Sequence, residues 1–130
     1  MNNAVVRTAV SVLAGMVAAS LLIMLVELIA HAAIPLREGA AMPQALTIAV
    51  AAGWFFGSLL GALAAMRLSH RIMPGWMVGA IIAALSLYNT QSMPHPAWMV
   101  VAAVVLPLVA VLIAKALLRR QLTEAPRIAR

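Results

Sequence analysis

The residues whose types and spacing could do chemistry are an acid and two histidines. Glu27 is the one carboxylate in an otherwise uncharged, mostly apolar run from Ala9 to Ala30, and His31 follows at position i+4. Residues with this spacing share one face of a helix, and Ser20 lies close to the same face. An ionisable group inside a segment long enough to cross a bilayer is energetically expensive, and such groups mark functional sites.

The third candidate, His95, stands between Pro94 and Pro96 at the end of a polar stretch that begins at Tyr88. The two prolines restrict the backbone on either side of the histidine. We predict that this stretch is an outer loop between two helices. From such a loop His95 can reach over the mouth of the bundle toward Glu27 and His31.

These side chains admit three interpretations. In the first, Glu27 is protonated or hydrogen-bonded to a neighbouring helix and only holds the helices together. In the second, Glu27 handles a proton or another cation, and His31 exchanges the proton with the outside. In the third, Glu27, His31 and His95 are the nitrogen and oxygen ligands of zinc or another divalent metal ion. The sequence leaves all three open.

The composition indicates that lipid is the solvent for much of the chain. Of 130 residues, 65% are hydrophobic and 9% are charged, and the mean hydropathy is +1.06. Soluble domains carry about 25% charged residues. A chain of this size cannot bury so much apolar surface in one aqueous core. Because cysteine is absent, disulfides and thiolate metal sites are excluded.

The apolar segments predict an all-α, four-helix transmembrane bundle. Each approaches the length of about 20 residues that spans the hydrocarbon, and the third is the shortest. No segment alternates with a period of two, which excludes a closed barrel. Ala30-His31-Ala32 resembles a signal-peptide cleavage site, but the apolar run before it is longer than a signal peptide's apolar region. The prediction is one transmembrane domain over 1–120, with helices at about 5–33, 45–66, 73–90 and 97–118, and a polar cytoplasmic tail over 121–130.

The basic residues predict the orientation of the bundle. In a four-span arrangement, all but Arg37 fall on one side of the membrane, which is then the cytoplasmic side. Both termini are therefore expected in the cytoplasm, with helices running up-down-up-down. The expected partner of these residues is anionic lipid rather than nucleic acid, since they flank the membrane and lack interleaved aromatics. The residues on this side are Arg7, Arg67, Arg71, Lys115, Arg119, Arg120, Arg127 and Arg130.

Small residues at every fourth position predict close helix packing. Gly53, Gly57 and Gly61 belong to a stripe that also contains alanines at 45, 49 and 65. Gly75 and Gly79 begin a shorter stripe in the third segment. Small residues let helix backbones approach closely in lipid. Either the two stripes pack together within one protomer, or one of them forms the seam of a homodimer.

Two motifs carry a resemblance to a known group of proteins. They are the Glu-x-x-x-His spacing of Glu27 and His31, and the Pro-His-Pro-x-Trp sequence from Pro94 to Trp98. Together with the stretch from Gly53 to Ser58, they make the chain similar to an uncharacterised family of small bacterial four-helix integral membrane proteins. The resemblance implies this fold and a location in the inner membrane, but no activity.

Enzymatic motifs are missing from the sequence. It contains no nucleophile–base pair, no phosphate-binding loop and no cofactor motif, so we predict neither an enzyme nor a cofactor. The predicted function is a small non-enzymatic inner-membrane protein that assembles with itself or serves as an accessory subunit of a larger membrane complex. The alternative is a small proton-coupled transporter or ion-conducting oligomer that uses Glu27.

Overall fold

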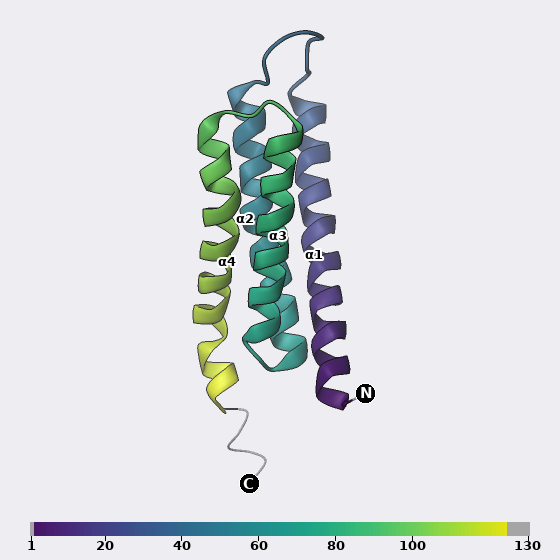
Figure 1. Ribbon diagram of the computed structural model, residues 1–130, viewed down its shortest axis with the longest axis vertical. Helices are drawn as coiled ribbons and strands as arrows, with labels where there is room; N and C mark the ends of the chain where they lie inside the picture. The colour runs from purple at the N-terminus through teal and green to yellow at the C-terminus, as the bar shows by residue number, and fades with distance from the viewer. Residues whose placement is uncertain (1, 125–130) are drawn as a thin grey trace.

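The computed structural model describes residues 2–124, whose secondary structure is entirely helical. The helices are α1 (Asn3–Ala33), α2 (Gln44–Ser69), α3 (Met73–Ser92) and α4 (Ala97–Glu124). Consecutive helices are joined by short connections and run antiparallel in one bundle (Figure 1). The predicted all-α four-helix fold is therefore confirmed. The last part of the predicted tail, with Arg127 and Arg130, lies outside the described residues.

Proline residues mark most of the helix boundaries. Pro35 follows the end of α1, and Pro43 directly precedes α2. Pro74 occupies the first turn of α3, where its missing N–H is not needed. Pro96 directly precedes α4. Because proline lacks a backbone N–H and restricts the residue before it, these positions favour the breaks that divide one long apolar chain into four helices, although α4 continues through Pro107.

All four helices are longer than the sequence predicted, and the polar ends of α3 and α4 are two examples. α3 continues through Asn89 and Thr90 to Ser92, so only residues 93–96 form the connection to α4. Thr90 and Ser92 donate their hydroxyls to carbonyl groups one turn earlier in α3, at 2.7 and 3.0 Å. The hydroxyl groups of these residues are therefore hydrogen-bonded within α3, and no helix-breaking residue precedes Pro94. α4 likewise continues to Glu124, past the predicted start of the tail.

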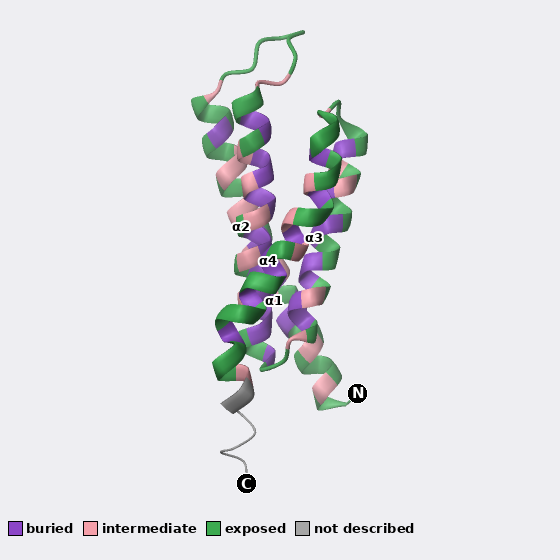
Figure 2. Ribbon diagram, turned by 90° about the vertical axis from the view of Figure 1, so that its left-hand side faces the viewer, coloured by how far each residue is buried: buried purple, intermediate pink, exposed green. Residues whose placement is uncertain are grey.

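The central helix of the bundle is α2, which contacts each of the other three. α3 also contacts all the others, whereas α1 and α4 make no contact with each other within the described residues. Buried residues line the inner faces of the helices (Figure 2). Figure 2 also shows that the α1–α2 pair and the α3–α4 pair diverge toward the end that carries the two loops, 34–43 and 93–96. This end is called the loop end below.

The glycine stripe of α2 packs mainly against α1. A Cβ atom added at Gly57 would meet the side chain of Ile23, and one added at Gly61 would lie 2.6 Å from the carbonyl oxygen of Gly15. Gly75 packs instead against Met66 of α2, and Gly79 against Val111 of α4. The two glycine stripes therefore do not pack on each other. The three glycines of the α2 stripe are buried within the protomer.

Three of the helices, α1, α2 and α4, are long and apolar enough to cross a membrane. α3, with 20 residues, is the shortest and ends in the polar sequence Tyr-Asn-Thr-Gln-Ser. It nevertheless lies beside the others along the bundle (Figure 1). By helical rise it is about 30 Å long, which equals the thickness of the hydrocarbon core.

Candidate functional site

The divergence of the helix pairs leaves a groove near the loop end, between α1, α2 and α3. It has a volume of about 220 Å³. Each of the three helices contributes to its walls, so no single segment of the sequence defines it. The lining residues are Ser20, Ile23, Met24 and Glu27 from α1, Trp54 from α2, and Ile82, Leu85, Ser86 and Asn89 from α3.

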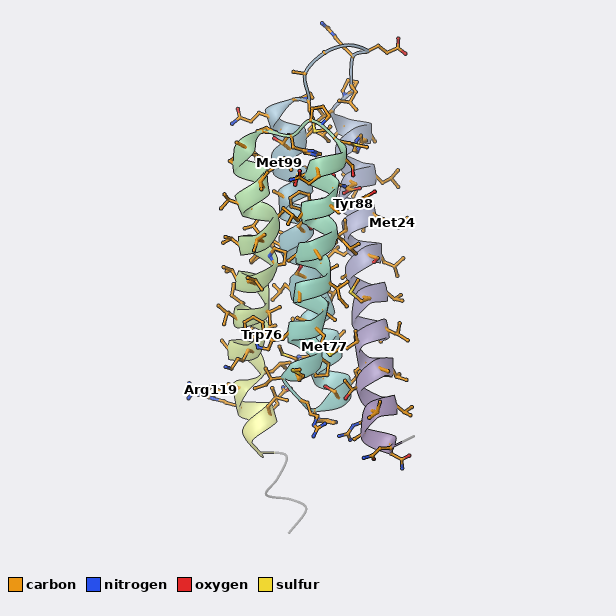
Figure 3. The ribbon with its side chains drawn as sticks, viewed as in Figure 1. Met24, Trp76, Met77, Tyr88, Met99 and Arg119 are labelled. Atoms are coloured by element: carbon orange, nitrogen blue, oxygen red, sulfur yellow. The ribbon has the colours of Figure 1, made fainter. Side chains whose placement is uncertain are left out.

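The groove has a closed floor and opens sideways between α1 and α3. Trp54 and Ser86 form part of the floor and are each 3% exposed. Met24 on α1 and Leu85 on α3 form the rim and are 65% and 55% exposed. Figure 3 shows Met24 at about the height of Tyr88, the residue that precedes Asn89 on α3. The opening therefore lies on the apolar flank of the bundle.

The polar side chains of the groove have no partners in the protein. Within residues 2–124, neither the Glu27 carboxylate nor the Asn89 amide makes a hydrogen bond or an ion pair. Ser20 and Ser86 also make none, although Ser86 is buried. Buried polar groups are normally hydrogen-bonded, because an unpaired one costs about 1–3 kcal/mol. Of the four unpaired side chains that line the groove, Ser86 is buried, Glu27 and Asn89 are partly buried, and Ser20 is exposed.

Most hydroxyl side chains elsewhere in the bundle behave differently, since they donate to carbonyl groups of their own helix. Examples are Ser11, whose hydroxyl lies 2.7 Å from the carbonyl oxygen of Arg7, and Ser69, at 2.7 Å from that of Ala65. Outside the groove, the described part of the chain has two further hydroxyls without a hydrogen bond, those of the buried Ser58 and the exposed Tyr88. Two of the four unpaired hydroxyls, those of Ser20 and Ser86, therefore line the groove.

His31 lies near Glu27 but bonds to its backbone. The Nδ1 atom of His31 donates to the carbonyl oxygen of Glu27 at 2.8 Å. The imidazole is exposed at the end of α1 and is not part of the groove lining. Since Nδ1 is the donor, Nε2 is the ring nitrogen that remains for a proton or a ligand.

His95 lies away from Glu27. Its Nδ1 atom donates to the carbonyl oxygen of Met93 at 2.9 Å, within its own loop. It lines a separate pocket with residues of the loop that joins α1 to α2, among them Leu36 and Met42. Among the residues the structure describes, no three histidine or acidic side chains gather closely enough to hold a metal ion. The three-ligand metal site of Glu27, His31 and His95 is therefore not assembled.

The site residues that the sequence did not reveal are Trp54, Ser86 and Asn89. Asn89 lies in both the predicted helix over 73–90 and the polar stretch predicted as an outer loop, and the structure places it in α3, where it lines the groove. A helical signal was present, because Ser86 follows Ile82 by four residues and Asn89 follows Ser86 by three. Trp54 carries no comparable signal, since a tryptophan in a span usually packs in the core or lies at an interface.

Comparisons of the chain with family models, curated proteins and solved structures found no match. The likeness to the small bacterial four-helix family therefore rests on the motifs around Glu27 and His95 and on the stretch from Gly53 to Ser58. What the chain does must be argued from the groove and its chemistry.

Proposed function

We propose that this chain is a small non-enzymatic protein of the bacterial inner membrane that binds and releases a proton or another cation at Glu27. It would act as a small proton-coupled transporter or ion-conducting oligomer. The observation that carries the proposal is the presence of four unpaired polar side chains at one groove. These side chains are Ser20, Glu27, Ser86 and Asn89.

The proposal includes a membrane arrangement with four spans, in which α3 crosses the membrane together with α1, α2 and α4. Both termini then lie in the cytoplasm. The end of the bundle opposite the loop end carries Arg7, Arg67, Arg71, Lys115 and the arginines at 119 and 120. Arg37 lies in the loop at the other end. This asymmetry favours the cytoplasm for the end rich in basic residues.

The depth of Glu27 supports a site that cations can reach. α1 has 31 residues and is therefore about 46 Å long, longer than the hydrocarbon core of about 30 Å. From Glu27 to the end of α1 at Ala33 the helical rise is about 9 Å. With α1 centred on the bilayer, Glu27 lies near the outer boundary of the hydrocarbon, and the groove extends inward from it.

The absence of a partner for Glu27 argues against a purely structural role. A carboxyl group that holds two helices together makes a hydrogen bond across their interface. Within the described residues, Glu27 makes no such bond to α2 or α3. A proton or a bound cation would neutralise a carboxylate at this depth, where an uncompensated charge is costly.

The test is a proton-flux assay in proteoliposomes that contain a pH-sensitive dye and carry an imposed membrane potential. The wild type is expected to carry protons in response to the potential and so to change the internal pH, either alone or when a transported cation is added. Glu27→Gln is expected to abolish this flux. Glu38→Gln is the matched control, since it removes the same charge from the exposed loop after α1. Equal flux in the wild type and in Glu27→Gln would overturn the proposal.

The second candidate is a subunit that assembles with itself or with a larger membrane complex. It is favoured by α1, which is the least buried of the three helices that are long and apolar enough to cross a membrane. Because the glycine stripe is used inside the protomer, α1 is the surface on which a partner would pack. Native mass spectrometry of the gently extracted protein tests this candidate, and a purely monomeric protein would count against it.

A further inference from the structure

We propose that the ligand of the groove is the primary ammonium group of an amphiphile, which enters from the lipid. This inference rests on the proposed cation site at Glu27 and names the class of cation. It is drawn from the kinds of hydrogen-bonding groups in the groove, from the size of the groove, and from the side on which it opens.

The unpaired groups of the groove match the donors of a primary ammonium. The Glu27 carboxylate is an acceptor, and the side chains of Asn89 and Ser86 each offer an acceptor oxygen. An alkylammonium group carries three N–H donors and one positive charge. It can therefore neutralise the acid and donate to the amide and the hydroxyl at the same time. Ser20 adds a further acceptor at the edge of the groove.

Other cations fit the groove less well. A trimethylammonium group has no N–H donor, so Asn89 and Ser86 would stay unpaired beside it. Such groups are usually bound in cages of several aromatic rings, and Trp54 is the one aromatic side chain in the lining. A divalent metal ion lacks ligands, because the described residues place no second carboxylate or histidine in the groove with Glu27.

The size and opening of the groove indicate that the ligand is amphiphilic. The volume of about 220 Å³ is below the range of about 300–1,000 Å³ typical of pockets that enclose drug-sized molecules. The groove therefore fits a head group, with the rest of the molecule outside it. Met24 and Leu85 at the rim are apolar and exposed, and they would contact an alkyl chain that continues into the lipid.

The experiment compares dodecylammonium with dodecyltrimethylammonium, which have the same chain and the same charge. The protein is held in phosphatidylcholine nanodiscs, and Trp54 fluorescence reports binding after Trp76→Phe and Trp98→Phe remove the other tryptophans. We expect a saturable change in emission, with a midpoint at least tenfold lower for dodecylammonium. Circular dichroism verifies that the double variant keeps its helices.

Two substitutions in the groove separate the contribution of the charge to binding from that of the hydrogen bonds. Glu27→Gln is expected to raise the dodecylammonium midpoint at least tenfold, whereas Glu38→Gln should leave it unchanged. Asn89→Leu should weaken the binding of dodecylammonium but not that of the trimethylammonium analogue, so that the difference between the two midpoints becomes smaller. If the two probes bind with equal midpoints in the wild type, or if neither saturates, the inference is wrong.

The same measurements separate this inference from the proposed function. Equal binding of both probes that still depends on Glu27 would end the primary-ammonium inference and leave the cation site standing. Binding that does not depend on Glu27 would also end the inference, and the proton-flux assay of Glu27→Gln would then decide the proposed function separately. The source of the ammonium is tested by exchanging phosphatidylcholine for phosphatidylethanolamine. If the groove binds the lipid head group, phosphatidylethanolamine competes and dodecylammonium binds more weakly in that lipid. If the groove binds a soluble amine instead, the midpoint for dodecylammonium is the same in both lipids.

Discussion

The contact between α1 and α2 allows one substitution to be compared at two positions of the same helix. At Gly61, an added Cβ atom would lie 2.6 Å from the carbonyl oxygen of Gly15, which belongs to the backbone and cannot rotate away. At Gly53, an added Cβ atom would lie 3.5 Å from the nearest atom, a methyl group of Val26. Gly61→Ala should therefore force the helices apart, while Gly53→Ala should fit.

The magnitude follows from the distances. A relaxed carbon–oxygen contact is about 3.3 Å, so Gly61→Ala requires a shift of about 0.7 Å. A gap of this size forfeits about a quarter to a half of the dispersion energy at each separated contact. Overpacking of this kind costs about 1–3 kcal/mol, and better helix propensity returns about 1 kcal/mol. Gly53→Ala keeps the propensity gain without the clash, so we expect the two variants to differ by about 2 kcal/mol.

The assay is unfolding by sodium dodecyl sulfate in mixed micelles, followed by circular dichroism. A difference of about 2 kcal/mol corresponds to more than a tenfold change in the ratio of folded to unfolded protein. Gly61→Ala should unfold at a lower detergent fraction than the wild type, and Gly53→Ala at the same or a higher one. If both variants unfold together, the close backbone contact between Gly15 and Gly61 is refuted.

Two further substitutions test other parts of the fold. His70 ends α2 with φ of 54°, a left-handed conformation that favours glycine, so His70→Gly should stabilise the protein by about 1 kcal/mol in the same unfolding assay. Destabilisation would show that the imidazole makes a needed contact. Trp54, 3% exposed, packs with Val50 and Met99, so Trp54→Ala should cost about 3–5 kcal/mol. The control is Trp98, which is 43% exposed, and Trp98→Ala should cost less than about 1 kcal/mol. Similar losses of stability at both positions would contradict the packing of Trp54 in the core.

The four helices could be predicted from the sequence because their causes are local. Long apolar runs must form helices to satisfy their backbones in lipid, and Pro35, Pro43 and Pro96 interrupt the chain between runs. The ends were less predictable where polar residues continue a helix. Asn89 and Thr90 look like a loop by composition, yet they belong to α3 because no breaker precedes Pro94.

The site was predicted in part. The cost of burying a carboxylate identified Glu27 without any structure. The sequence could not show that His95 bonds within its own loop, because that depends on the conformation of a proline-flanked turn. The sequence also could not show which residues share the groove with Glu27, since Ser86 and Asn89 lie far along the chain and line the same groove only in the bundle.

The sequence by itself determined the number of helices, their approximate bounds, and the end of the bundle at which the basic residues gather. Only the tertiary structure decided which faces meet. In lipid, burial of apolar surface does not favour one helix pairing over another, so a stripe such as Gly53, Gly57 and Gly61 fits any neighbour whose surface is complementary. In this protein the neighbour is α1, whose Gly15, Ala19 and Ile23 contact the stripe. The same packing leaves the helix pairs apart at the loop end, and the groove at Glu27 is the result.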